Sequence, residues 1–338
     1  MSILDRWDER QAAEEDAIKP YETMTLGASL AFAGVNECDT TSALARLASE
    51  HSAKAESFYS ATRRVQSDFK FEGGILNFRS AVATETENND IVHAKVHEAK
   101  NRRNAVVILP HLNAPMWPYG SICKYLVQFG ITAVELCMPY HGVRNRPGAR
   151  TSDYFLSANL GRTIRSVRQA VTDTKGVIDW LAERGYENLG VIGLSLGSCV
   201  GGLVGAHDRR VRASAMLLTA GDFGEVVWTG RATKHIKAAL AAGITLEELR
   251  QVWSIISTGT FTEELSRPGH KILILSGSRD RAVAPYLTRR FVDQLKDRGA
   301  QLTWHVLPCG HYSLALFPFN ALAFLALIRF FRAAGFLK

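Results

Sequence analysis

From residue 105 onward, short runs of β-branched and aliphatic residues alternate with longer segments of helical periodicity, and no other feature constrains the fold as strongly. Each apolar run is long enough for a strand covered on both faces, and each intervening segment is long enough for a helix. Parallel strands need such crossover segments, because a tight turn cannot connect them. The alternation therefore predicts an α/β fold with a mostly parallel central sheet covered by helices on both faces.

The expected elements follow one another along the chain, and the pairs Arg184-Gly185 and Arg298-Gly299 are typical helix ends. Strands are expected at residues 105–109, 132–138, 189–194, 213–219, 271–276 and 302–307. Helices are expected at residues 116–128, 160–184, 197–207, 286–298 and 320–334. Upstream, two strands at residues 75–80 and 91–97 flank a polar run, which predicts a hairpin.

Two segments depart from the alternation and predict additions to a main domain at residues 71–338. Residues 1–70 are rich in Ala and Glu and predict a helical N-terminal extension. Residues 222–268 contain helix-like sequence without a strand. An insertion at that point would cover the sheet edge where ligands bind, so we predict a helical cap.

Charge and hydropathy patterns exclude several classes of protein. Lys and Arg outnumber Asp and Glu by 40 to 33, but the basic residues are spread along the chain without a nucleic-acid-binding motif. The most apolar stretch, residues 321–331, is interrupted by Arg329 and is too short for a membrane span. Residues 1–15 lack an apolar signal-peptide core. We therefore expect a cytoplasmic protein that neither binds nucleic acid nor spans a membrane.

Cysteine and histidine spacing gives no support for a disulfide framework or a metal site. The five cysteines are an odd number without a CxxC pair, which favours buried free thiols. No HExxH motif, paired carboxylates at ligand spacing or Cys/His cluster is visible. We therefore expect neither a metal ion nor another cofactor.

The most informative motif is Gly193-Leu194-Ser195-Leu196-Gly197, between an expected strand and an expected helix. In that context Gly-x-Ser-x-Gly forms a nucleophile elbow, a strained turn that projects the serine from the strand end. The alternative is that the glycines only let a helix pack on a strand, as in dinucleotide-binding folds. That fold carries its glycine-rich turn after the first strand, whereas this motif comes late. We therefore predict Ser195 as a nucleophile.

A serine nucleophile needs a base and a carboxylate, and candidates for both follow strands. Asp280 comes after the expected strand at residues 271–276 and His311 after the one at 302–307, at the edge where active sites of such sheets form. Asp222 competes for the role of the acid. His111 and His141 also follow strands, but both precede the serine.

From about residue 105 to its C-terminus, the chain resembles the α/β-hydrolase superfamily in its elbow, acid loop and histidine loop. It also resembles a poorly characterised bacterial branch through residues 139–144 (PYHGVR), 193–198 (GLSLGS) and 307–312 (LPCGHY). In this superfamily the triad follows the order Ser, acid, His. The resemblance implies a triad of Ser195, Asp280 and His311 that acts on an ester, thioester or related acyl bond.

The oxyanion hole of such a site needs two backbone N–H donors. Leu196, directly after the nucleophile, is expected to supply the first. The second is expected from the loop at residues 110–115, where Leu112 replaces the glycine of the usual His-Gly pair. Either Leu112 or Asn113 could therefore donate, and His111 is expected to brace the loop.

Three arginines after the expected strand at residues 132–138 are candidate substrate contacts. Arg144, Arg146 and Arg150 could face the pocket, where guanidinium groups bind carboxylates or phosphates. The alternative is a charged loop that contacts only water.

Together these residues predict a cofactor-free serine hydrolase that cleaves an ester or related acyl bond of a small-molecule substrate through an acyl-enzyme. An acyltransferase or a peptidase would use the same triad. A catalytically silent protein of this fold would instead bind a ligand or partner through the cap and the extension. The sequence leaves the acyl group, the leaving group and the oligomeric state open.

Overall fold

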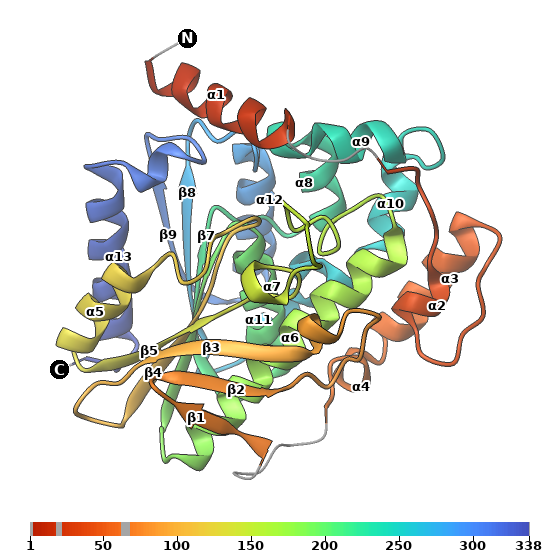
Figure 1. Ribbon diagram of the computed structural model, residues 1–338. Helices are drawn as coiled ribbons and strands as arrows, with labels where there is room; N and C mark the ends of the chain where they lie inside the picture. Colours follow the sequence, from red (N-terminus) through yellow and green to blue (C-terminus); the bar gives the residue numbers. More distant parts are fainter. Residues whose placement is uncertain (1–2, 18–21, 62–67, 338) are drawn as a thin grey trace.

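The computed structural model describes residues 3–17, 22–61 and 68–337. Within this part of the chain, one nine-stranded sheet of order β1-β2-β3-β5-β4-β6-β7-β8-β9 forms the centre (Figure 1). The strands are β1 (Lys70–Glu72), β2 (Ile75–Arg79), β3 (Ile91–His97), β4 (Asn104–Leu109), β5 (Ile131–Leu136), β6 (Asn188–Leu194), β7 (Val211–Leu217), β8 (Lys271–Gly277) and β9 (Gln301–Leu307).

The sheet is parallel from β5 to β9 and antiparallel at its other end, where β1, β2 and β3 form a meander that joins β5. Strands β4 and β5 are buried along their whole length, as expected for strands covered on both faces. All six expected strands of the parallel region and the expected hairpin are confirmed. Strand β1 was not predicted, because its three residues, Lys-Phe-Glu, carry too little apolar pattern.

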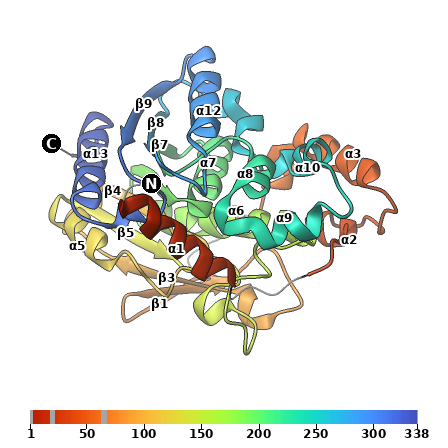
Figure 2. The same ribbon diagram turned by 90° about the horizontal axis from the view of Figure 1, so that it is seen from above.

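Helices cover both faces of the sheet (Figure 2). Helices α5 (Gly120–Gln128) and α13 (Phe319–Ala333) contribute to the core on one face. Helices α6 (Leu160–Glu183), α7 (Leu196–His207) and α12 (Pro285–Asp297) contribute to the core on the other. Helix α5 begins later than expected, since Trp117 has a positive φ of 51° that no helix accommodates. None of the described helices is both long and apolar enough to cross a bilayer.

The segments at residues 1–70 and 222–268 are largely helical where they are described. The first contains α1 (Ile3–Ala17), α2 (Ala28–Ala31), α3 (Thr41–Ser52) and α4 (Ala55–Phe58), and the second contains α8 (Phe223–Thr229), α9 (Lys234–Leu240), α10 (Leu246–Val252) and α11 (Thr262–Leu265). Helices α3 and α10 pack together, and Thr41 donates a hydrogen bond to Glu248. The division into extension, main domain and cap stays a prediction.

Helix α1 lies apart from the other N-terminal helices. In both views it crosses the edge of the sheet at which the parallel strands end, near the loops after β8 and β9 (Figures 1 and 2). It contacts the short helical turns at residues 231–233 and 313–315. A segment from the start of the sequence therefore lies over the edge that carries the candidate active site.

Candidate active site

Ser195 occupies a sharp turn between β6 and α7. Its φ is 53°, a left-handed value that is strained for any residue with a side chain. A Cβ atom at Gly193 would collide with the backbone of Gly197, and one at Gly197 would collide with the carbonyl group of Leu109. Only glycine fits at these two positions, so the turn has the geometry expected of a nucleophile elbow.

The structure brings the three predicted triad residues together. The Ser195 Oγ lies 2.9 Å from Nε2 of His311, and Nδ1 of His311 lies 2.8 Å from Oδ2 of Asp280. The other carboxylate oxygen, Oδ1 of Asp280, accepts hydrogen bonds from the backbone N–H groups of Ala282 and Val283, both at 2.8 Å. Asp280 is 4% exposed. Its carboxylate is held by His311 at one oxygen and by two backbone N–H groups at the other.

The charge environment suits His311 to the role of a base. Burial alone would lower the pKa of His311, but the charge of Asp280 and its hydrogen bond raise that pKa, with further contributions from Glu15 and Asp8. The net result is a pKa above the ordinary histidine value. The imidazole can therefore accept the serine proton and stabilise the positive charge that it acquires.

Asp222, the competing acid, has a different role in the structure. Its side chain accepts a hydrogen bond from the backbone N–H of Glu225 at 2.9 Å and caps the start of α8. Its second oxygen lies 2.6 Å from Nε of Arg250. The carboxylate that contacts His311 is that of Asp280, not that of Asp222.

The loop after β4 indicates which amide is free for an oxyanion. The backbone N–H of Asn113 donates to Nε2 of His141 at 3.2 Å, so it is already engaged. Burial lowers the pKa of His141 to about 4, and the ring donates from Nδ1 to the carbonyl of Pro139, which leaves Nε2 as an acceptor. Among the described residues, the backbone N–H groups of Leu112 and Leu196 have no partner. Of the two candidate amides, the available one is that of Leu112.

Comparisons with known proteins support the fold at low sequence identity. No family model matches the chain, and no curated protein matches it in sequence. An acylaminoacyl peptidase of Pyrococcus horikoshii is 13% identical with a TM-score of 0.59 over 78% of this chain. An esterase of Pyrococcus furiosus is 12% identical with a TM-score of 0.54 over 92% of this chain and 99% of its own. The protein has the α/β-hydrolase fold.

A third structure, a cold-adapted esterase from an Arctic intertidal metagenomic library, is 18% identical with a TM-score of 0.51. It matches 82% of this chain and 100% of its own length. This chain spans only 41% of the length of the peptidase. The match thus extends over nearly the whole length of the two esterases but over less than half of the peptidase.

The side chain of Arg144 points into the protein interior, which corrects the proposal that it could contact substrate. Its side chain is fully buried, and Nη2 lies 2.7 Å from Oδ2 of the equally buried Asp173 on α6. The guanidinium also donates to the carbonyl oxygens of Asn89 and Cys137. A buried charge requires such partners, and this interior ion pair leaves Arg144 unavailable to a ligand.

The other two arginines of that loop, Arg146 and Arg150, are less buried than Arg144. The guanidinium of Arg146 lies over the ring of Tyr154, with Cζ 3.5 Å from the ring centroid, and Arg162 lies 3.9 Å from the same centroid. Arg150 is exposed. No hydrogen bond joins Arg146 or Arg150 to a triad residue in the part of the chain that the structure describes. Substrate contact by these two residues stays a prediction.

Sequence reasoning missed the residues of α1 that contact the site. Asp8 accepts hydrogen bonds from the backbone N–H groups of Tyr312 and Ser313, directly after His311. Glu15 accepts from the side chains of Asn113 and Tyr312, at 2.8 and 2.5 Å. An acidic, Ala-rich helix reads as a solvated surface element, so its sequence carries no signal for such contacts.

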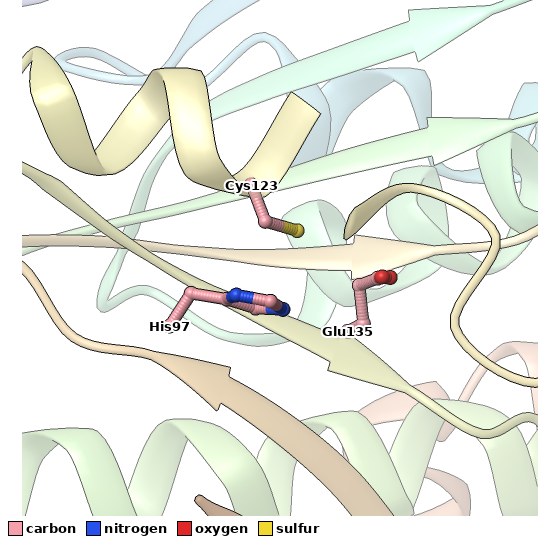
Figure 3. A group of neighbouring side chains, drawn as sticks. All are labelled: His97, Cys123 and Glu135. Carbon is pink, nitrogen blue, oxygen red and sulfur yellow. The ribbon is translucent and has the colours of Figure 1, made fainter. Parts of the chain in front are cut away.

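One group of side chains in the described residues could hold a metal ion, and it lies outside the triad. His97 on β3, Cys123 on α5 and Glu135 on β5 point toward one another (Figure 3), and their ligand atoms all lie within 4.8 Å of each other. The sequence analysis recognised no such cluster, because antiparallel pairing of β3 with β5 brings distant residues together.

Proposed function

We propose that the protein is a serine hydrolase that cleaves a carboxylic ester or a related acyl bond. The observation that carries the proposal is the continuous hydrogen-bonded chain from Ser195 through His311 to Asp280, with contacts of 2.9 and 2.8 Å. The strained φ of Ser195 adds to it, since backbone strain is typical of a residue held for function.

The proposed reaction follows from these contacts. As Oγ of Ser195 attacks the acyl carbonyl, its proton passes to Nε2 of His311, while Asp280 stays ionised and stabilises the imidazolium. The tetrahedral oxygen accepts hydrogen bonds from the N–H groups of Leu196 and Leu112. His311 then protonates the leaving group, which departs and leaves an acyl-serine. His311 then takes a proton from water, whose oxygen attacks the acyl-serine carbonyl, and the carboxylic acid departs as the proton returns to Oγ of Ser195.

An ester is favoured over a peptide bond by the comparisons. Two proteins named as esterases align over 99% and 100% of their own length, whereas the peptidase has a much longer chain. An acyltransferase would use the same residues with an alcohol or amine in place of water. The complete hydrogen-bonded triad argues against a catalytically silent protein, which would need none of these contacts.

The proposal is tested by labelling with a fluorophosphonate and by turnover of p-nitrophenyl esters of increasing chain length. We expect the wild type to be labelled and to hydrolyse at least one ester, and Ser195→Ala to lose both activities while keeping its fold. Ser254→Ala, at a hydroxyl that donates to the carbonyl of Gln251, is the matched control and should retain both. Labelling of Ser195→Ala at another serine would contradict the assignment.

A further inference from the structure

Helix α1 is attached to the active-site edge by a series of acidic side chains. Glu9 pairs with Arg231 and Arg281, and Asp5 pairs with Arg279. The two arginines at 279 and 281 flank the triad residue Asp280. Helix α1 is therefore anchored to the same loop that supplies the acid of the triad.

Asp8 is the most deeply inserted of these acidic residues. It is 6% exposed and accepts three hydrogen bonds from the loop after β9: from the N–H of Tyr312 at 2.7 Å, and from the N–H and hydroxyl of Ser313 at 3.0 and 2.6 Å. A side chain at Gly310 would collide with the carboxylate of Asp8. The residues on both sides of His311 are thus fitted to one carboxylate of α1.

Glu15, two turns further along α1, joins two loops across the site. One of its oxygens accepts a hydrogen bond from the side chain of Asn113, next to the proposed oxyanion donor Leu112. The other accepts from the hydroxyl of Tyr312, next to His311. A single side chain therefore connects the loop after β4 with the loop after β9.

We propose that α1 is a component of the active site, in which Asp8 and Glu15 are positioning residues for the His311 loop and the oxyanion loop. This inference rests on the proposed serine hydrolase function. The physical reason is that a general base acts only within hydrogen-bonding reach of its proton, and a displacement of about 1 Å can lower a rate by about a hundredfold. Both backbone N–H groups that follow His311 are fixed by Asp8 rather than by the sheet.

The charge of α1 also acts on His311 itself. The ionisable groups that face His311 are Asp280 from the loop after β8, Glu15 and Asp8 from α1, and His111 from the loop after β4. Against the effect of burial, all three carboxylates raise the pKa of His311. Removing the charge of Glu15 should lower that pKa and keep the imidazole neutral, and active, at a lower pH.

The experiment compares full-length variants by their pH profiles of kcat/KM. In Asp8→Ala we expect the pH-independent plateau of kcat/KM to fall by about ten- to a hundredfold, mainly through kcat. The reason is that the backbone N–H groups of Tyr312 and Ser313 lose the carboxylate that accepts their hydrogen bonds. In Glu15→Gln, which keeps an acceptor for Tyr312, the acid limb should move to lower pH with a smaller change in the plateau. Glu14→Gln is the matched control, because Glu14 pairs with Arg10 on the exposed face of α1.

Each outcome has a defined meaning. An unchanged plateau in Asp8→Ala together with an unchanged acid limb in Glu15→Gln would overturn the positioning role while leaving the hydrolase proposal intact. A higher plateau in Asp8→Ala would overturn it as well and would make α1 an obstruction. Asp8→Asn provides a second variant that keeps the size of the side chain, and it should show a smaller loss than Asp8→Ala. Failure of the hydrolase proposal is recognised separately, since the wild type itself would then show no labelling at Ser195.

A second inference concerns His97, Cys123 and Glu135, and it is carried by different observations. Among the described residues, Nε2 of His97 and Oε1 of Glu135 are buried side-chain atoms without a hydrogen-bond partner. Unsatisfied buried polar atoms are uncommon, because each one loses its interactions with water. Here two of them belong to the same three-residue group (Figure 3).

The surroundings of Glu135 favour a ligand on its unpartnered oxygen. Oε2 accepts a hydrogen bond from the backbone N–H of Tyr119 at 3.2 Å, which fixes the orientation of the carboxylate. Lys95 is the residue opposite Glu135 in the β3–β5 pairing, yet its Nζ lies over the ring of Trp117, 5.1 Å from the centroid. The Cys123 thiol interacts with the same carboxyl group. Among the residues that the structure describes, no cation lies at salt-bridge distance from Oε1.

We infer that these three side chains form a site for a zinc-like divalent cation. Imidazole, thiolate and carboxylate are the ligands of tetrahedral zinc sites, and water from the half-buried side of His97 would supply the fourth. A dication balances one thiolate and one carboxylate.

The test uses purified protein that has been dialysed against a chelator and titrated with cobalt(II), followed by zinc. We expect one equivalent of cobalt(II) to give a thiolate charge-transfer band that zinc removes. Cys123→Ser should lose the band, and His97→Gln should bind more weakly. Cys38→Ser, at a cysteine outside the group, is the control. Absence of the band in the wild type, or its persistence in Cys123→Ser, would overturn the proposed site.

Discussion

The loops after β9 and after β5 leave the same edge of the sheet, and each carries an ionisable residue that the sequence analysis names as a candidate for the site. His311, after β9, lies between Ser195 and Asp280 at that edge. Arg144, after β5, turns into the interior and pairs with Asp173 on α6. The difference shows that strand order locates a loop, whereas a buried partner elsewhere in the chain decides where its side chains point.

The largest effect is expected from a substitution that disrupts the contacts of His311 with Ser195 and Asp280. Asp280→Asn removes the charge that orients and stabilises His311, and kcat should fall by roughly 10⁴, as in the serine proteases. Asp222→Asn should have a far smaller effect, because Asp222 caps α8 and pairs with Arg250. Both values come from steady-state turnover of the best p-nitrophenyl ester. The opposite ranking of the two variants would assign the acid to Asp222.

The sequence predicts those features of the site that depend on the local pattern of residues around each strand end. Ser195, Asp280 and His311 each follow a strand, so the alternation of elements and the order of the motifs predict that these three side chains lie together, as they do in the structure. Parallel strands place their carboxyl ends at one edge, which makes the meeting of three distant residues predictable.

The parts that could not be predicted depend on contacts between segments far apart in the chain. Nothing in the pattern of residues 3–17 indicates that Asp8 would fit beside Gly310, or that Glu15 would reach both Asn113 and Tyr312. The burial of Arg144 depends in the same way on Asp173, which lies on a helix whose periodicity says nothing about charge pairing.

The second prediction concerns a substitution that removes the buried ion pair between Arg144 and Asp173. Arg144→Met leaves the carboxylate of Asp173 buried without its cation, which should destabilise the fold by about 3–5 kcal/mol. Arg103→Met is the control, because Arg103 and Glu187 form an exposed pair that contributes at most about 1 kcal/mol. Urea unfolding measures both variants. A loss below 1 kcal/mol in Arg144→Met would show that the pair has no structural role.

The smallest expected effects concern the two arginines of the β5 loop that remain near the surface, and they sharpen the contrast with His311. Arg150 is exposed, so Arg150→Ala should leave kcat/KM within about twofold for a neutral ester and for a carboxylate-bearing ester of equal size. Arg146 is held against Tyr154, and its charge should favour the anionic ester by at most about fivefold. A direct contact with substrate would instead produce a loss of roughly ten- to a hundredfold in Arg146→Ala, confined to the anionic ester. Measuring both esters on both variants therefore separates an arginine that binds substrate from one that only adds positive charge near the site.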